Sequence, residues 1–316
     1  MATSAGSSVS DSAGIAAWGE RLGKGIARGM QLDGEVVHVV LCVLLAGGHI
    51  LLEDRPGVGK TQLARSIANS IEGKFARIQG TVDLLPADVL GTTIWYASSE
   101  AFGFHPGPVF ANVVLIDELN RATPKTQSGL LEAMAELQVT VEGQAHQLPR
   151  PFTVIATQNP TAGFDGTYAL PPAQLDRFMA RLSLGYPSAT AEADLLASPP
   201  GPSLSPVANL DEVTRAIAAV GELHAGRPLL DYMVALLSAT REHPLSESGA
   251  SPRGGLMLLR AARARAALHG RDFVVPDDVK ALALAVLAHR IQPIAGAPAE
   301  AQRTIVEDAL ERVPAR

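Results

Sequence analysis

Cysteine and aromatic residues are scarce in this chain. Cys42 is the one cysteine among 316 residues, so an intramolecular disulfide is excluded. It lies in an apolar run, which is typical of a small buried residue. Aromatic residues make up 4% of the chain although 47% of it is hydrophobic, so a core must consist mainly of Ala, Val, Leu and Ile. The length is sufficient for two domains.

The sequence also lacks a secretory signal and an apolar run long enough to span a membrane. Residues 1–14 are rich in Ser, Ala and Gly, with no basic start and no apolar stretch, so we expect a disordered tail there. The longest apolar stretch, Val36–Leu52, is interrupted by two histidines and a Gly-Gly pair and falls short of the roughly 18 residues that span a membrane. A helix over Glu35–Ala46 and a strand over His49–Leu52 explain it better. We therefore expect a soluble, cytoplasmic protein without membrane insertion.

An excess of positive charge is absent, since the formal net charge is −6. This balance argues against electrostatic binding of nucleic acid or acidic membrane as the main role, although a local basic groove would be compatible with it. No stretch interleaves basic and aromatic residues. Arg260, Arg263 and Arg265 are clustered at helical spacing, which more often serves a subunit interface or a solvated face.

What is present is an alternation of short apolar strands and helical segments, from about residue 15 to residue 186. This alternation predicts an α/β domain with a mainly parallel sheet and helices on both faces. A stretch rich in Pro, Ser and Ala over 187–210 predicts a linker, and residues 211–316 have the periodicity of a small all-helical domain. The five predicted strands are His49–Leu52, Phe75–Gln79, Val113–Ile116, Phe152–Thr157 and Met179–Leu184. The five predicted helices of the second domain are Asp211–Leu223, Pro228–Arg241, Pro252–Leu268, Pro276–Ile291 and Pro298–Arg312.

A phosphate-binding loop follows the first predicted strand and precedes a helix. Backbone N–H groups around Gly57–Thr61 can surround a β-phosphate, and the positive end of the helix that follows adds to the attraction. Lys60 is expected to reach the β- and γ-phosphates and the Thr61 hydroxyl to bind Mg²⁺. Asp54 stands where the usual pattern has Gly, and Asp tolerates unusual dihedrals better than most residues. The nucleotide-binding residues predicted in this loop are Asp54, Pro56, Gly57, Val58, Gly59, Lys60, Thr61 and Gln62.

A buried strand ending in two acids, Asp117 and Glu118, comes about 55 residues after the loop. In a parallel sheet, both carboxylates lie at the same edge as the phosphates. We expect Asp117 to hold Mg²⁺ through water and Glu118 to polarise the water that attacks the γ-phosphate. The alternative is an acidic pair that only solvates a turn.

Two further residues are candidates for the hydrolysis site. Asn159 follows the strand Phe152–Thr157, where it can orient the attacking water, although an Asn before a Pro is also an ordinary turn. Arg177 can supply charge to a γ-phosphate bound by a neighbouring subunit, where it would stabilise the phosphoryl transition state. A surface role for Arg177 beside Asp176 stays open.

Five segments together resemble the AAA+ ATPases and, within them, the MoxR family, over roughly residues 35–290. The resemblance implies a three-layer αβα P-loop domain with a mainly parallel five-stranded sheet, followed by a small all-helical lid domain. The segments are LLEDRPGVGKT (51–61), GPVFANVVLIDELNRATPKTQSGLLEAMAELQVTVEG (107–143), FTVIATQNP (152–160), GTYALPPAQLDRF (166–178) and GASPRGGLMLLRAARARA (249–266).

The resemblance assigns roles that spacing alone could not. Asn159 matches sensor 1, and Arg177 matches the arginine finger that acts across the subunit interface. Arg253 matches the sensor-2 arginine of the lid, which reads the γ-phosphate within the same chain. Arg121 is a second candidate for the finger, and Arg181 also lies near the expected interface.

Two hairpins and the front end of the domain complete the comparison with the family. Thr92–Tyr96 with Ala101–His105, and Gln138–Val141 with His146–Pro149, predict hairpins that in AAA+ rings point towards the pore or the substrate; decorative hairpins are the alternative. The family commonly carries a Val-Gly-Gln turn where adenine packs. Arg28–Gly34 departs from that turn, so the adenine contacts are not assigned.

The resemblance implies an ATP-driven machine that binds Mg²⁺ and forms a homo-oligomeric, hexameric ring. Such proteins act as chaperones in remodelling, maturation or metal insertion, usually on a partner with a von Willebrand factor A domain. This chain contains no such domain, so that partner would be a separate protein. A DNA-directed AAA+ motor and a gas-vesicle-type assembly ATPase are the alternative functions, and the acidic balance makes nucleic acid the weaker expectation.

Overall fold

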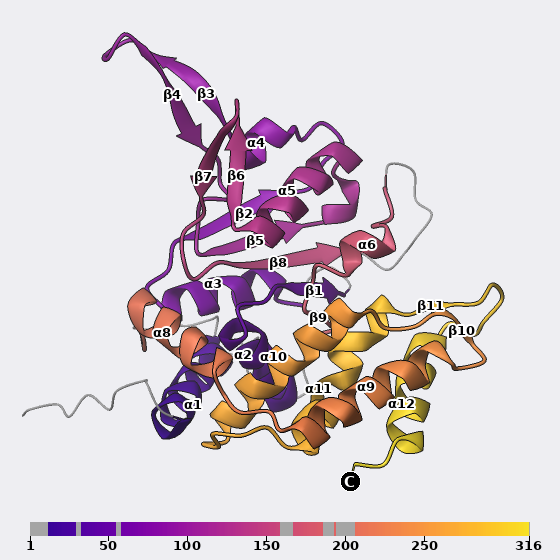
Figure 1. Ribbon diagram of the computed structural model, residues 1–316. Helices are drawn as coiled ribbons and strands as arrows, with labels where there is room; N and C mark the ends of the chain where they lie inside the picture. Colours follow the sequence, from indigo (N-terminus) through magenta and orange to yellow (C-terminus); the bar gives the residue numbers. More distant parts are fainter. Residues whose placement is uncertain are drawn as a thin grey trace, which may run out of the picture.

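The structure is a computed structural model that describes residues 12–29, 33–54, 58–158, 167–185, 193 and 206–315. A five-stranded sheet forms the centre of its first domain (Figure 1). All its strand pairs are parallel. In spatial order the strands are β2 (Phe75–Gln79), β5 (Val113–Asp117), β8 (Thr153–Gln158), β1 (Ile50–Glu53) and β9 (Ala180–Leu182). The predicted parallel five-stranded sheet is therefore confirmed.

The bounds of the strands differ little from the predicted ones, except in β9. That strand was expected over Met179–Leu184 but ends at Leu182. The Leu184 N–H donates instead to the carboxylate of Asp54, 2.7 Å away, so the chain leaves the ladder there. The prediction was wrong at this end because apolar character alone does not show which group accepts a hydrogen bond.

Side chains alternate between the two faces of the sheet, as successive residues of a strand must. Leu115 and Ile155 belong to one buried cluster, whereas Val114 and Val154 belong to the other. Helices α1 (Ser12–Gly29), α2 (Gly34–Leu45) and α3 (Lys60–Ser70) contribute to the first cluster. Helix α5 (Pro124–Glu136) and the short α4 (Pro86–Leu90) contribute to the second. The result is a three-layer αβα domain.

Helix α1 corrects the length of the expected tail. It begins at Ser12, so the last three residues of the expected disordered segment 1–14 belong to the helix. Ile15, Trp18, Leu22 and Ile26 recur at helical spacing and are fully buried, so this stripe fixes the helix against the core. Residues 1–11 lie outside the described part of the chain.

The second domain is mainly helical. A two-stranded antiparallel pair, β10 (Ser246–Ser248) with β11 (Gln292–Pro293), adds to it. The predicted helix to Ile291 ends earlier, because the chain tightens into the 3₁₀ turn η2 (Ala288–Arg290). The helices are α8 (Leu210–Gly221), α9 (Arg227–Arg241), α10 (Pro252–Leu268), α11 (Pro276–Leu287) and α12 (Ala301–Arg312). Most of the predicted linker 187–210 lies outside the described residues.

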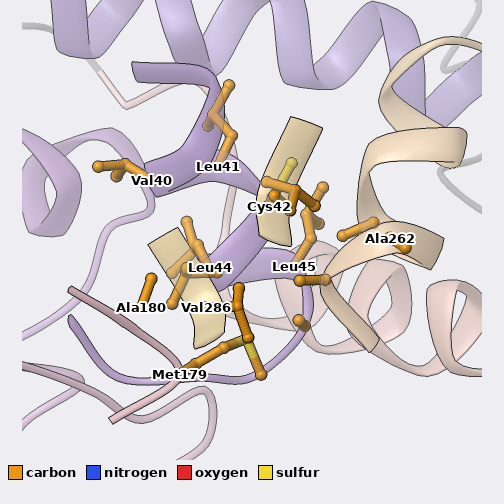
Figure 2. Packing of buried hydrophobic residues seen from close by; sticks show 14 of the residues in the cluster. Val40, Leu41, Cys42, Leu44, Leu45, Met179, Ala180, Ala262 and Val286 are labelled. Carbon is orange, nitrogen blue, oxygen red and sulfur yellow. The ribbon is translucent and has the colours of Figure 1, made fainter. Parts of the chain in front are cut away.

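The two domains share one buried core. Figure 2 shows Leu44 and Leu45 of α2 among Met179, Ala262 and Val286, which come from the sheet edge, α10 and α11. Because this apolar cluster is continuous from the sheet to the lid, a movement of one domain is transmitted directly to the packing of the other.

Two antiparallel hairpins rise from the end of the first domain opposite the lid (Figure 1). The first, β3 (Gly91–Tyr96) with β4 (Ala101–Pro106), has the predicted strands. The second pairs β6 (Gln138–Val141) with β7 (Gln144–Gln147), so its return strand begins two residues before the predicted His146. Glu142 and Gly143 both have positive φ, 49° and 79°, which forms a tight two-residue turn in place of the predicted longer one.

The hairpins contact each other through a stacked pair of rings, Phe104 of β4 and His146 of β7, whose centroids are 3.7 Å apart.

Among the residues that the structure describes, no helix combines the length and the apolar character needed to cross a membrane.

Candidate nucleotide site

A pocket of about 470 Å³ opens at the carboxyl edge of the sheet, where β2, β5, β8 and β1 end. Ligands of parallel α/β sheets bind at this edge. The pocket brings together seven of the predicted site residues: Asp54, Gly59, Lys60, Thr61, Gln62, Asp117 and Glu118, with Arg77, Gln79 and Thr157 beside them.

The described part of the phosphate loop has the geometry of a helix N-terminus. Gly59 caps α3 with a φ of 93°, in the left-handed region that favours glycine, and Lys60 begins the helix. The Lys60 ammonium donates to the main-chain oxygen of Asp54, 2.6 Å away, across the loop. Burial lowers the pKa of Lys60. The negative charges of Asp54, Asp117 and Glu118 oppose that shift. Val58 packs against the core, and Pro56 and Gly57 lie outside the described residues.

Asp54 is buried and has a role that its sequence position did not suggest. Its carboxylate accepts hydrogen bonds from the Ser183 hydroxyl and the Leu184 N–H, both at 2.7 Å, and from the Gly185 N–H at 3.3 Å. An aspartate in place of the usual glycine therefore fastens the start of the phosphate loop to the end of β9. The dihedral tolerance invoked from the sequence is not needed to explain it.

Asp117, at the end of β5, pairs with an arginine from the neighbouring strand β2. Arg77 places its terminal nitrogen 2.6 Å and its Nε 2.7 Å from the same carboxylate oxygen. The arginine side chain is 49% exposed and that of Asp117 13%, so solvent reaches the pair from the arginine side. A pair of this kind opens at small cost.

Glu118 occupies a left-handed backbone position, with a φ of 53°. Its N–H donates to the Thr157 hydroxyl at 2.9 Å, which fixes the turn between β5 and η1 (Leu119–Arg121). Its carboxylate accepts a hydrogen bond from Gln79 at 3.2 Å and forms an ion pair with Arg121 at 3.0 Å. The strained backbone at Glu118 is thus held from the two strands that flank β5. Thr157 of β8 binds its N–H, and Gln79 of β2 binds its carboxylate.

Three residues of the pocket escaped prediction: Arg77, Gln79 and Thr157. Arg77 and Gln79 are two apart on β2, so both lie on the same side of that strand. This spacing was visible in the sequence, but the adjacency of β2 and β5 was not. Thr157 lies near the end of β8. Its hydroxyl accepts the Glu118 N–H, and this role depends on the backbone turn at Glu118.

Mg²⁺ suits the donors that the pocket offers. The Thr61 hydroxyl and the Asp117 carboxylate both line it, and hard oxygen donors are the ligands that Mg²⁺ prefers. Lys60, which would reach the phosphates, lines the same pocket.

The predicted arginines are not part of this pocket. Arg177 follows α6 (Pro172–Leu175) and donates to the main-chain oxygen of Leu131, in a separate hollow of about 500 Å³ that also contains Glu132 and Glu136. Arg253 is exposed in the first turn of α10. Asn159 lies outside the described residues.

The two other arginines named from the sequence are engaged within the chain. Arg121 pairs with Glu118. Arg181 lies 3.4 Å from Glu53 and donates to Gln302 of α12 at 2.8 Å. Among the finger candidates, Arg177 is therefore the one that forms no ion pair with the described residues of its own chain.

Comparisons with known proteins agree with this geometry. The model of the ATPase family associated with various cellular activities (AAA) matches residues 49–180, and that of the AAA lid domain matches residues 238–309. The uncharacterized protein YeaC of Bacillus subtilis is 48% identical over 81% of this chain and 81% of its own length. The chaperone MoxR1 of Mycobacterium tuberculosis is 40% identical over 81% of this chain and 71% of its own length.

A solved structure shares the whole architecture. A crystal structure of a protein from Cytophaga hutchinsonii, assigned as an ATPase, superposes with a TM-score of 0.88. It is 34% identical in sequence, and the match covers 96% of this chain and 97% of that one.

Proposed function

The chain belongs to the MoxR family of AAA+ ATPases, and on that premise we propose that it couples Mg²⁺-dependent ATP hydrolysis to the remodelling of a partner protein. It is an ATP-hydrolysing enzyme by family. The observation that carries the proposal is the single pocket that contains Lys60, Thr61, Asp117 and Glu118 at the carboxyl edge of a parallel sheet.

Each residue of the pocket has a role that follows from its chemistry. Lys60 binds the β- and γ-phosphates, and it is free to do so once its hydrogen bond to the Asp54 carbonyl opens. Thr61 and Asp117 hold Mg²⁺, directly and through water respectively. Bound Mg²⁺ supplies positive charge to the phosphate oxygens during transfer. Pro56, Gly57, Val58, Gly59 and Gln62 complete the phosphate loop.

Glu118 orients and polarises the attacking water, and Asn159 acts on the same water as sensor 1. In the structure its carboxylate is engaged by Gln79 and Arg121. Both contacts use Oε2, so Oε1 can accept a hydrogen bond from the attacking water while Gln79 and Arg121 hold the carboxylate in place.

The site is completed by a neighbour in a hexameric ring. Arg177 lies outside its own chain's pocket, as expected of an arginine that acts on the adjacent subunit. Arg253 of the lid reads the γ-phosphate within the chain when the lid closes. Transition-state charge on the transferring phosphoryl group is the reason for both arginines.

A protein is a better client than DNA for the two hairpins. Neither β3–β4 nor β6–β7 contains Lys or Arg. Trp95 and Phe102 are 53% and 72% exposed on the first hairpin and form an edge-to-face pair 5.1 Å apart. Exposed aromatic rings on an arm without Lys or Arg suit apolar contact with protein, whereas phosphate backbones require basic residues.

We place the activity in the cytoplasm and take a separate protein with a von Willebrand factor A domain as the client. Maturation or metal insertion would be the outcome of the cycle. MoxR1 is itself named a chaperone, which supports this class of activity. The DNA-directed and gas-vesicle-type alternatives have no specific observation in their favour.

A trapping experiment tests the client. Glu118→Gln keeps the size of the side chain and the phosphate loop but removes the carboxylate, so ATP should bind and persist. We expect this variant, with ATP and Mg²⁺, to retain a protein with a von Willebrand factor A domain in a pull-down from the native cytoplasm. Lys60→Ala, which weakens phosphate binding, is the control and should retain none. Recovery of DNA without a protein client would contradict the proposal.

A mixing experiment tests the ring. Arg177→Ala subunits keep an intact pocket and Lys60→Ala subunits keep an intact arginine, so mixed assemblies contain some complete interfaces. We expect the mixture to recover ATPase activity that neither variant has alone. No recovery in assemblies of normal size would instead favour Arg121 as the finger.

A further inference from the structure

Arg290 occupies the junction between the α/β domain and the lid. It ends the 3₁₀ turn η2, after α11, and its side chain is only 1% exposed. Burial lowers the pKa of Arg290 to about 10, while Asp176 opposes that shift, so the guanidinium is charged at neutral pH. A buried cation persists only where several groups compensate for its lost hydration.

On the α/β side, the guanidinium binds the segment that follows α6. It donates to the main-chain oxygens of Phe178, Asp176 and Met179, at 2.6, 3.2 and 3.4 Å. Its Nε lies 2.8 Å from the Asp176 carboxylate, although the N–H is not directed at that oxygen, so this contact is ionic rather than a hydrogen bond. Arg177, the proposed finger, lies between Asp176 and Phe178 in the chain.

On the lid side, the same arginine packs under the first turn of α10. It contacts the sulfur of Met257, and a Cβ added to Gly254 would lie 2.7 Å from its Cδ. The helix cap Ser251 directs its hydroxyl towards the Asp176 carboxylate, at 3.4 and 3.5 Å from the two oxygens. Arg253, the proposed sensor 2, lies in this turn and is near enough to oppose the charge of Arg290.

We propose that Arg290 is a positioning residue that joins the start of α10 to the segment 176–179, so that Arg253 and Arg177 move as one unit. The inference rests on the proposed function, because it uses the roles given there to these two arginines. ATP bound in one subunit would draw in Arg253, and through Arg290 and Asp176 the movement would reach the finger that serves the next subunit. The cis site and the trans finger would then be coupled within a single chain.

The path is short and rigid. Four main-chain carbonyls, three of them in the segment 176–179 and the fourth that of Val286, accept from a single guanidinium. The Asp176 carboxylate lies beside it, and the helix cap Ser251 contacts that same carboxylate. Since packed interiors do not deform gradually, the start of α10 cannot shift far without moving the residues that Arg290 holds.

Hydrogen exchange of the assembled Glu118→Gln protein with ATP and Mg²⁺ tests the coupling without need for hydrolysis. In this parent we expect ATP to slow exchange in peptides that cover 253–257 and 176–179. Arg290→Lys keeps the charge but loses the planar fork that reaches three carbonyls. Protection at 253–257 should remain in that variant, whereas protection at 176–179 should fall at least about fivefold, the lower end of typical coupling between sites.

The lid offers a matched control. Arg271 forms an ion pair with the buried Asp278 at 2.6 Å, and both residues belong to the lid. Arg271→Lys is therefore an equally conservative change in a half-buried arginine pair that is not on the path. We expect it to leave protection at both segments as in the parent.

Two results in the variants would overturn the coupling. One is equal ATP protection of both segments in Arg290→Lys, and the other is loss of the 176–179 protection in Arg271→Lys as well. Protection of 253–257 alone in the parent would overturn it too. Protection of neither segment in the parent would contradict the nucleotide site itself, and the coupling with it.

A second variant covers the case in which Arg290→Lys does not fold. Asp176→Asn keeps the shape and the contact with Ser251 but removes the charge opposite Arg290. It should show the same loss of protection at 176–179 and a lower kcat for ATP hydrolysis in the wild-type background, with nucleotide affinity unchanged. An unchanged kcat together with full protection would overturn the inference.

Discussion

Two aspartates of this protein, Asp117 and Asp278, both pair with arginine but in opposite surroundings. In the nucleotide pocket, the partner of Asp117 is half-exposed Arg77. In the lid, Asp278 is fully buried and bound by two arginines: Arg265 donates at 2.7 Å, and Arg271 donates to both carboxylate oxygens, at 2.6 and 2.7 Å. The first pair can open to solvent, and the second cannot.

The difference separates groups that react from groups that hold the fold. Burial by itself would raise the pKa of Asp278, but hydrogen bonds from Arg271, the Val275 N–H and Arg265 outweigh it, so the pKa lies below its ordinary value. Exposed pairs contribute little to stability, whereas a buried pair that loses one partner leaves a charge without hydration. Removal of each carboxylate should therefore affect different properties.

The largest effect should follow Asp278→Asn. This change leaves two guanidinium groups facing a neutral amide, and breaking a buried pair typically costs about 3–5 kcal/mol. We expect the free energy of unfolding to fall by about that amount in urea denaturation at neutral pH, while nucleotide affinity per folded molecule stays as in the parent. A loss below about 0.5 kcal/mol, as for an exposed pair, would remove the contrast between the two aspartates.

Asp117→Asn should have the opposite profile. The variant loses the carboxylate that we propose to hold Mg²⁺ through water, and we expect kcat to fall about 100-fold, or about 2.7 kcal/mol of transition-state stabilisation. The Mg²⁺ concentration needed for tight ATP binding should rise in a titration monitored by a fluorescent nucleotide. Stability should change by less than about 0.5 kcal/mol, because solvent reaches the lost pair through half-exposed Arg77.

Arg77→Gln is the control for stability, since it removes the same pair from the other side and keeps the carboxylate. Its free energy of unfolding should also stay within about 0.5 kcal/mol of the parent value. A large loss of stability in either variant would mean that the pocket pair holds the fold after all.

The fold was largely predictable because its signals are local. A few neighbouring residues suffice to recognise each of these signals: the short apolar strands, the glycine and lysine of the loop, and the acids after Ile116. Helix α1 was not predicted as an element of its own, because the small polar residues before Ile15 conceal the buried stripe that begins there. Strand β7 begins earlier than predicted because Glu142 adopts a left-handed backbone conformation, which the propensity of glutamate does not predict.

The site was predictable in its loop and acids but not in what surrounds them. Asp278 lies in the first turn of α11, where its carboxylate accepts the Val275 N–H at 3.0 Å, a local contact of the kind a sequence can suggest. Its two arginine partners come from other segments, 7 and 13 residues away in the chain. Arg77, Gln79 and Arg290 were missed for the same reason: their partners are brought together by tertiary packing.

His49 extends the comparison to a buried titratable group that directly precedes β1. Its Nδ1 accepts from the Val154 N–H at 3.1 Å, so its Nε2 carries the proton and donates to the Met134 carbonyl at 3.2 Å. Burial lowers the pKa of His49 to about 4, against a weaker opposing effect of Met134. The ring is therefore neutral in the native state at any pH well above 4.

The smallest of the three effects is a pH dependence that His49→Gln should reduce. Below about pH 6.5 the unfolded chain binds a proton at this histidine, whereas the native state does not until about pH 4. The contribution of His49 to stability is thus complete above pH 6.5 and is lost as the pH falls towards 4, by up to about 1.4 kcal/mol per pH unit. Glutamine can make both hydrogen bonds without titrating, so between pH 7 and pH 5 this variant should lose about 2 kcal/mol less than the parent in urea denaturation. His224→Gln, at an exposed histidine, is the control and should follow the parent curve, and a His49→Gln curve parallel to the parent would show that burial does not keep this ring neutral.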